Sequence, residues 1–410
     1  MNPPPTPAGP PSVAPSVIWK IDLCRGLFAF LGVAAHAFDA CCTIQWGQIS
    51  QIPEPWATLL HNTVQYGAYW VMGFFVISGY CIQLSVGRQL DQGPLPLPIY
   101  LAARLTRIAP LYYAGLLFAL VVECLIAPIR VPYYPDGVDG GGFLAQVFFT
   151  QRLVRTFGAF APSWTITNEM FYYLLFGGIA ALFGGHRSRP AWVGMALSIV
   201  VGGLMQGLYL SGTKHPVVLR VGLLFGLGIN WFLGALVAAH GDAWVKSPAV
   251  RRVRRFWPVI FLGAVGLNVW DRCPDQVLYL VLGVAFALMM VRFLARAYEQ
   301  SLFGNDAGLT PSRKRLAEVV GLASYPTYLF HAPILLTLVS VLAWSGQNVP
   351  WWATWMVLVS TGIGVGTVLG WTVERPLMTR RAAFLKRWKN RQTKPSAVPA
   401  GRHPALSQGA

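Results

Sequence analysis

The sequence predicts an all-α protein, a polytopic membrane helix bundle of about ten transmembrane helices with both termini in the cytoplasm. Three observations predict this class. Apolar residues make up 55% of the 410 residues and charged residues only 11%, with a mean hydropathy of +0.50. Apolar stretches long enough to cross a bilayer recur along the chain. Lys and Arg gather on alternate connections between them. A water-soluble surface could hardly be built from this composition.

Ten apolar stretches come near the length of about 20 residues that a hydrocarbon core about 30 Å thick requires. The seventh is short and has the weakest signal. In chain order they cover residues 22–43, 67–87, 108–128, 163–184, 190–210, 217–239, 256–271, 275–294, 319–343 and 351–374.

We expect little folded structure outside these apolar stretches. Residues 1–16 are rich in proline, and we expect a disordered tail there. Residues 17–376 form the predicted transmembrane domain, and residues 377–410 a basic cytoplasmic tail. The longest outer connection, 129–162, carries a short amphipathic stretch at 143–153, and a loop of that length is often functional.

The net charge of +17 would suggest nucleic acid in a soluble protein, but its distribution indicates topology instead. With the N-terminus inside, most basic residues fall on cytoplasmic segments. We therefore expect anionic lipid head groups, and not nucleic acid, as the partner of the basic face. We place the protein in a cell membrane, most simply the cytoplasmic membrane of a bacterium. The outer connections hold Arg130, Arg152, Arg155, Lys214 and Arg272.

The first stretch carries a histidine at an unusual depth. Arg25 and His36 lie eleven residues apart, so a helix places the imidazole about 16 Å from the guanidinium along its axis. That is roughly half of the hydrocarbon core. A titratable ring at this depth costs free energy, so it indicates a working group.

Two further titratable residues are expected at a similar depth. His331 lies twelve residues into the ninth stretch, about 18 Å from the inner face, and Glu169 in the fourth lies about 21 Å from it. With His36, three titratable groups from three helices would share one layer about 5 Å thick.

At the cytoplasmic mouth, Arg104 and Arg107 are expected to open the third helix, followed by Pro110. An i, i+3 spacing places both guanidinium groups on one helix face, and a helix N-terminus would add positive potential. Together they predict an anion clamp suited to phosphate.

An ordered set of motifs resembles the acyltransferase type 3 family of membrane-bound acyltransferases. The resemblance covers residues 18–376, nearly the whole predicted bundle. Its motifs are Arg25 followed by His36, Phe74-Phe-Val-Ile-Ser78-Gly79, Arg104-x-x-Arg107-Ile-x-Pro110, Ser163-Trp164-Thr-Ile-Thr-Asn-Glu169, Ser324-x-x-x-Tyr328-Leu-Phe-His331-x-Pro333 and Glu374-x-Pro376.

The resemblance implies transfer of an acyl group, commonly acetyl from acetyl-CoA, to a hydroxyl of a carbohydrate or lipid-linked glycan, with some relatives acylating small molecules. Acyl-CoA would be a co-substrate, and neither a permanently bound cofactor nor a metal is expected. Thr165 and Asn168 stand where many relatives have Ser and a small or acidic residue, which weakens the assignment of Glu169 slightly.

Thioester chemistry suggests a role for each residue. His36 is the expected general base, because burial keeps an imidazole neutral, with Glu169 orienting its ring and His331 polarising the thioester carbonyl or positioning the acceptor. A covalent acyl-histidine relay stays open. The remaining assignments are Arg25, Arg104 and Arg107 for the acyl-CoA, and Trp164, Tyr133 and Tyr134 as a weaker prediction for the acceptor sugar.

Each assignment has a simpler alternative. His36, His331 and Glu169 would serve as hydrogen-bonding groups between helices. The arginines would be flanking anchors, and Trp164 and the two tyrosines an aromatic belt. A secondary transporter would also place ionisable groups near the midplane. The six cysteines are expected to be packing residues, with a disulfide on the outer face as an alternative for Cys41, Cys42, Cys124 and Cys273.

Overall fold

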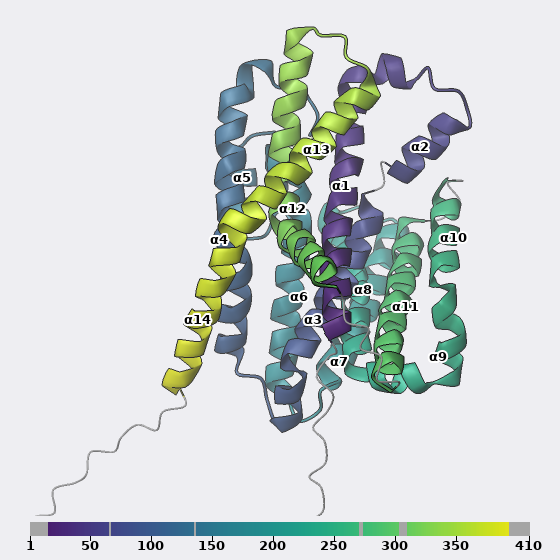
Figure 1. Ribbon diagram of the computed structural model, residues 1–410, viewed down its shortest axis with the longest axis vertical. Helices are drawn as coiled ribbons and strands as arrows, with labels where there is room; N and C mark the ends of the chain where they lie inside the picture. The colour runs from purple at the N-terminus through teal and green to yellow at the C-terminus, as the bar shows by residue number, and fades with distance from the viewer. Residues whose placement is uncertain (1–14, 65–66, 135–136, 270–273, 303–309, 393–410) are drawn as a thin grey trace, which may run out of the picture.

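A computed structural model describes residues 15–64, 67–134, 137–269, 274–302 and 310–392 (Figure 1). Most of the predicted N-terminal tail, much of the predicted C-terminal tail and Cys273 lie outside the described residues. Cys24, Cys41, Cys42, Cys81 and Cys124 are free thiols. The described residues form helices and no strands, which confirms the all-α class.

The α-helices follow one another along the chain, and apart from the long segment between α4 and α6 most connections are short. They are α1 (Pro15–Ile49), α2 (Trp56–Val64), α3 (Ala68–Gln92), α4 (Leu97–Ile126), α5 (Gly140–Val147), α6 (Trp164–Leu182), α7 (Arg189–Leu210), α8 (Pro216–Lys246), α9 (Pro248–Val253), α10 (Trp257–Val269), α11 (Asp275–Leu302), α12 (Pro311–Ser345), α13 (Trp351–Leu369) and α14 (Arg375–Gln392). Three short 3-10 helices, η1 (Ala127–Ile129), η2 (Gly158–Ser163) and η3 (Arg254–Phe256), and one π-helical turn, η4 (Gly370–Glu374), complete the described part.

Eight helices in the described residues are long and apolar enough to cross a membrane, which confirms a polytopic bundle. The two remaining predicted spans form α6, with 19 residues, and α10, with 13. The total of about ten crossings therefore stays a prediction.

The long helices α1 and α12 pack against each other, and α13 packs against both. On one side α4 contacts α12 and α6, and on the other α3 contacts α8, which also meets α7 and α11. The continuous helix formed by α13, η4 and α14 crosses diagonally in front of α12 and α4 (Figure 1). This arrangement surrounds an interior bounded by α1, α3, α4, α6 and α12.

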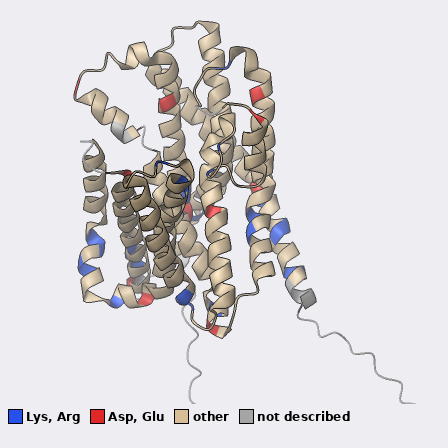
Figure 2. Cartoon of the chain, turned by 180° about the vertical axis from the view of Figure 1, so that it is seen from behind, with Lys and Arg blue, Asp and Glu red and all other residues tan. Residues whose placement is uncertain are grey.

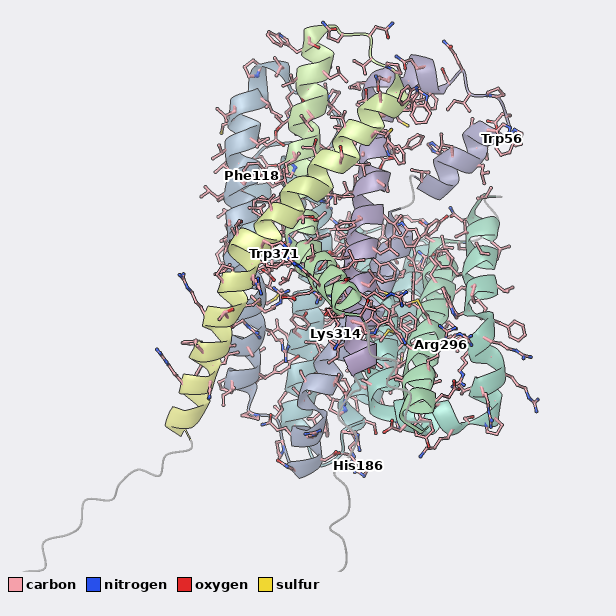
Figure 3. All side chains as sticks on the ribbon, viewed as in Figure 1. Trp56, Phe118, His186, Arg296, Lys314 and Trp371 are labelled. Carbon is pink, nitrogen blue, oxygen red and sulfur yellow. The ribbon has the colours of Figure 1, made fainter. Side chains whose placement is uncertain are left out.

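The outer surface of the bundle is apolar, as contact with lipid requires. Trp56 and Phe118 project from it (Figure 3) and are 64% and 36% exposed. Lys and Arg gather in the lower half of the molecule and along α14 (Figure 2). In Figure 1, α1 begins and α14 ends in that half. Which side of the membrane this end faces stays a prediction.

The long connection between α4 and α6 is folded against the bundle by a buried carboxylate. Glu123 accepts a hydrogen bond from Arg130 Nε at 2.7 Å and another from the backbone N–H of Ala159 at 2.6 Å. Gly158, which directly precedes Ala159, has a φ of +37°, and a Cβ there would meet the Glu123 side chain. The connection therefore has a fixed path, which determines where α6 begins.

Helices α3 and α8 approach closely through glycines. A Cβ on Gly79 would meet the carbonyl of Trp231, and a Cβ on Gly234 would meet the carbonyl of Val76. Small residues at such contacts let backbones come together where lipid supplies little hydrophobic driving force. The contact turns the neighbouring residue of α3, Ser78, toward the interior.

We expect Gly234→Ala to destabilise the bundle by about 1–3 kcal/mol, because the added methyl group must push α3 away from α8. Gly226→Ala is the matched control in the same helix, since a Cβ there meets nothing within 4 Å. Thermal unfolding of both variants in detergent measures the difference. Equal melting temperatures for the two variants would show that the α3 to α8 contact is not tight.

Candidate active site

The bundle encloses a cavity of about 790 Å³ between α1, α3, α4, α6 and α12. Side chains from seven helices that are far apart in the sequence converge on it, because α2 contributes His61 and α14 contributes Arg381 besides these five. Most of the predicted site residues line it, namely Arg25, His36, Arg104, Arg107, Trp164, Glu169 and His331.

One face of α12 contributes three side chains that line the cavity at successive levels, meaning successive heights along the helix axis. Tyr325, Tyr328 and His331 repeat every three residues and all line the cavity, so each is displaced from the last by about 4.5 Å along the axis. The Arg107 guanidinium lies 5.3 Å from the ring centre of Tyr325, and His331 meets His36 two levels further on. The arginine and histidine groups are therefore about 9 Å apart along α12.

The two histidines form a ring pair with centres 5.3 Å apart. His331 is buried, and its Nδ1 lies 2.9 Å from the carbonyl oxygen of Tyr328 and 3.1 Å from that of Thr327. A carbonyl only accepts, so Nδ1 carries the proton. Nε2, which is buried without a hydrogen-bond partner in the described residues, is then a bare nitrogen that can accept a proton.

His36 is positioned by contacts from three directions. Its Nδ1 lies 3.9 Å from Asp39 Oδ2, and its backbone carbonyl accepts a hydrogen bond from the Tyr133 hydroxyl at 2.7 Å. Two residues earlier, the Trp355 indole N–H donates to the carbonyl of Ala34 at 2.9 Å. The carboxylate beside the ring is therefore Asp39, one helical turn along α1, and not the expected Glu169.

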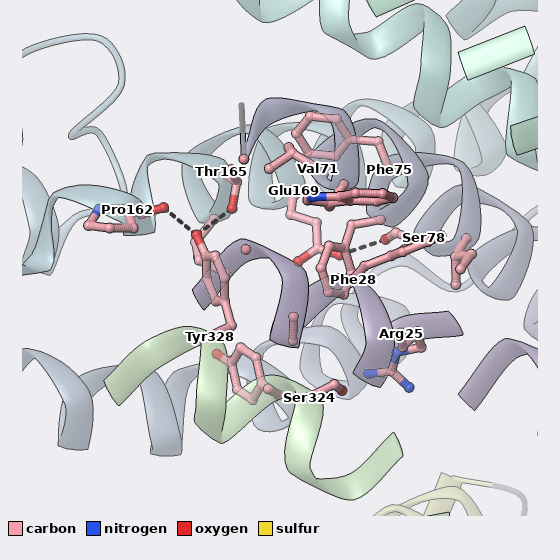
Figure 4. A pocket seen from close by; sticks show the side chains of 18 of the residues that line it. Arg25, Phe28, Val71, Phe75, Ser78, Pro162, Thr165, Glu169, Ser324 and Tyr328 are labelled. Carbon is pink, nitrogen blue, oxygen red and sulfur yellow. Dashed lines mark hydrogen bonds between the residues drawn. The ribbon is translucent and has the colours of Figure 1, made fainter. Parts of the chain in front are cut away.

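Glu169 belongs to a separate hydrogen-bonded cluster on the cavity wall. It accepts hydrogen bonds from the Ser78 hydroxyl at 2.6 Å and the Tyr173 hydroxyl at 2.9 Å. The Trp231 indole N–H donates to Ser78 Oγ at 3.2 Å. Figure 4 shows Ser78 turned toward Glu169 across the pocket. Both hydrogen bonds reach the same oxygen, Oε1, so the network fixes the carboxylate inside the bundle through one of its two oxygens.

Tyr328 ties α12 to the start of α6. Its hydroxyl lies 2.5 Å from the Pro162 carbonyl and 2.5 Å from the Thr165 hydroxyl, as Figure 4 shows. Since the carbonyl can only accept, Tyr328 donates to Pro162 and Thr165 donates to Tyr328. Thr165 therefore supplies the hydrogen bond to Tyr328 that a serine hydroxyl could also supply at this position.

A cluster of arginines occupies the other part of the cavity. Arg107 forms an ion pair with Glu374, which is 1% exposed. Arg104 donates to Ser85 at 2.9 Å and lies 5.2 Å from the ring centre of Tyr100. Arg381 from α14 donates to the carbonyl of Ala103 at 2.6 Å. The Nε atoms of Arg104 and Arg381 are both buried without a partner in the described residues.

The prediction that the third membrane helix begins at Arg104 is wrong. Helix α4 begins at Leu97, with Pro98 in its first turn, where proline is favoured because its missing N–H would have no partner. Arg104 and Arg107 are thus well inside the helix, and the potential of its N-terminus does not act at their positions. Their common face is confirmed, since both line the cavity.

Of the three residues predicted to bind the acceptor, only one lines the cavity. Trp164 lines the cavity, and the guanidinium of Arg152 lies 4.5 Å from its ring centre. Tyr133 and Tyr134 are outside the lining and pack on each other with ring centres 4.4 Å apart. Burial raises the pKa of the Tyr133 phenol well above its usual value, so it stays a donor to the backbone of His36.

Sequence reasoning missed two residues of the cavity, Asp39 and Arg381. The spacing of three residues from His36 was a signal for Asp39, because i and i+3 share a helix face. Arg381 had no such signal, since it lies in a basic run assigned to the C-terminal tail. Only the path of α14 back along α4 brings Arg381 to the cavity.

Comparison with known proteins agrees with this geometry. A family model described as an acyltransferase domain, that of the acyltransferase type 3 family, matches residues 18–371. No curated protein and no solved structure gives a significant match to the chain. Because the match spans most of the chain and includes every helix that lines the cavity except α14, the protein belongs to the acyltransferase type 3 family and is a membrane acyltransferase.

Proposed function

We propose that the protein is an acyl-CoA-dependent O-acyltransferase that moves an acyl group, most simply acetyl, to a hydroxyl of a carbohydrate or lipid-linked glycan. One observation carries the proposal. The same cavity is lined by a cluster of four arginines and by the imidazoles of His36 and His331, which can accept a proton when they are neutral. The first group suits the phosphates of coenzyme A, and the second suits the activation of an alcohol.

The donor would place its phosphates at Arg25, Arg104, Arg107 and Arg381 and extend its thioester toward the histidines. Arg25 and His36 are eleven residues apart on α1, which is close to three full turns, so both face the same side of the helix about 16 Å apart. Glu374 neutralises part of the cluster through Arg107. The remaining positive charge favours an anionic ligand in this low-dielectric interior.

His36 is the proposed general base. The acceptor oxygen attacks the thioester carbonyl carbon while its proton passes to His36, the carbon–sulfur bond then breaks, and the departing thiolate takes that proton. The products are an ester and coenzyme A with a free thiol. Asp39 would stabilise the transient imidazolium, since an apo separation of 3.9 Å can shorten when charge develops.

His331 suits the acceptor better than the thioester carbonyl. Polarising a carbonyl requires an N–H directed into the cavity, but the N–H of His331 is bonded to the Tyr328 backbone. Its bare Nε2 can instead accept a hydrogen bond from a second hydroxyl of the acceptor. Two imidazoles 5.3 Å apart would thus hold neighbouring hydroxyls of a sugar, one of which reacts.

The alternatives are distinguishable. A secondary transporter is disfavoured by the family to which the chain belongs. A small-molecule acceptor fits the same chemistry as a glycan. Direct transfer differs from an acyl-histidine relay because a relay leaves radiolabel on the protein when purified enzyme meets labelled acetyl-CoA without acceptor.

We expect His36→Ala to lower kcat by about 100-fold to 10,000-fold, the usual contribution of a general base. The assay follows release of the coenzyme A thiol by purified protein in a hydroxyl-free detergent with acetyl-CoA and a glycan pool. His240→Ala is the control, because His240 bonds Trp192 and does not line the cavity. Turnover by His36→Ala at the rate of the unmodified protein would remove the base from the proposal.

We expect Arg381→Gln to raise KM for acetyl-CoA by about 10-fold or more, because hydrogen bonds to charged groups contribute about 1.5–3 kcal/mol. The exposed neighbour Arg380→Gln is the matched control on α14 and should leave KM unchanged. Donors lacking the 3′-phosphate or the diphosphate identify the contact. If Arg381→Gln weakens all donors to the same extent, Arg381 supports α4 and does not bind phosphate.

A further inference from the structure

Arg152 packs on Trp164, a residue of the cavity wall, and has no acidic partner among the described residues. Its guanidinium lies 4.5 Å from the ring centre of Trp164, the first residue of α6 and a lining residue of the cavity. Its Nε is buried without a hydrogen-bond partner. In the part of the chain that the structure describes, the side chain forms neither an ion pair nor a hydrogen bond, and only its backbone N–H bonds Thr167.

A second cation accompanies it. Arg220, in the first turns of α8, donates to the backbone carbonyl of Leu153, next to Arg152, at 2.7 Å, and has no carboxylate partner among the described residues. Burial lowers the pKa of the Arg152 guanidinium, and the charge of Arg220 lowers it further. The hydroxyls of Tyr172 and Tyr279 oppose this shift.

The other arginines of the same connection are neutralised. Arg130 bonds Glu123 at 2.7 Å, and Arg155 bonds Asp139 at 2.7 Å. Two half-buried cations side by side without a counter-ion are costly, because desolvation and mutual repulsion both oppose them. A ring face compensates a cation only in part. The pair is therefore best explained by an anion that the described residues do not supply.

Neither Arg152 nor Arg220 is among the residues that line the cavity, and Arg152 reaches the cavity wall through its contact with Trp164, which does line it. Trp164 adjoins Thr165, which bonds Tyr328, whereas Arg107 lies at the level of Tyr325. This part of the wall therefore belongs to α6, whereas the donor arginines Arg104 and Arg107 belong to α4. An acceptor seated there would present its hydroxyl to the imidazoles from a different side than the thioester.

We infer that Arg152 and Arg220 bind an anionic group of the acceptor, a phosphate or a sugar carboxylate, and so select charged acceptors over neutral ones. The inference rests on the proposed function of the cavity. Trp164 would stack on the sugar while Arg152, held against the opposite face of the indole, pairs with the charge beside it.

The test uses three acceptors that share one alkyl chain: octyl glucoside, octyl glucuronide and glucosyl octyl phosphate. Purified full-length protein in a hydroxyl-free neutral detergent receives acetyl-CoA, and thiol release gives kcat/KM for each acceptor. We expect at least one charged acceptor to exceed octyl glucoside by about 10-fold or more, the effect of a charged hydrogen bond. Preference for the glucuronide indicates a sugar carboxylate, and preference for the phosphate indicates a carrier phosphate.

Arg152→Met should reduce this preference to within about 2-fold while KM for acetyl-CoA stays unchanged, because its length is kept and only the charged contact is lost. Arg155→Met is the matched control in the same connection, since its cation already pairs with Asp139. Equal use of neutral and charged acceptors by the unmodified protein overturns the inference. An equal loss for all acceptors in Arg152→Met also overturns it.

A binding measurement separates this inference from the proposed function. Thermal unfolding of the protein with octyl glucuronide or glucosyl octyl phosphate, without acetyl-CoA, should show stabilisation that Arg152→Met loses and Arg155→Met keeps. Stabilisation without turnover supports the anion site and counts against the proposed transfer. Turnover without any preference or stabilisation by charge supports the transfer and overturns the anion site.

Discussion

A charged group inside an apolar bundle needs an oppositely charged partner, and the rest of this structure depends on that constraint. Arg107 and Glu374 meet where α4 passes the end of α13, and the ring of Tyr325 from α12 lies against the guanidinium. The Tyr325 hydroxyl in turn donates to the carbonyl of Ile108 at 2.9 Å. Removing either charge would leave the other desolvated and unpaired, which costs more than the pair itself contributes. Three helices are thereby held in one register.

The π-helical turn η4 belongs to the same junction. A π turn admits an extra residue into a helix and often occurs at functional sites. Here it ends at Glu374 within the continuous helix of α13 and α14, and α14 runs on along α4 and brings Arg381 to the cavity. Gly370 opens the turn, and a Cβ there would crowd the backbone of Leu322 and Ala323. The cluster of cations therefore depends on how closely α13 can approach α12.

The histidine pair relies on a different kind of support. Among the described residues neither ring has a carboxylate within ordinary hydrogen-bond distance, and Asp39 lies 3.9 Å from His36. Backbone carbonyls instead fix the tautomer of His331, and contacts to the carbonyls of α1 fix the position of His36. An imidazole held in this way stays neutral and available as a proton acceptor. The long connection between α4 and α6 contributes through Tyr133, so the segment that would meet the acceptor also positions the proposed base.

By itself the sequence determined the membrane class, the helices that carry the site and most of the site residues. Apolar length and charge distribution depend on the bilayer as a solvent, and His36, Glu169 and His331 stood out because titratable groups are costly there. Tertiary structure alone decided which groups touch. Glu169 bonds Ser78 and not His36, Arg381 arrives from the predicted tail, and Arg152 lies on Trp164 with no counter-ion among the described residues. The physical reason is that depth along a helix can be counted from residue spacing, whereas partners across helices depend on rotation, kinks and close backbone contacts that no single segment encodes.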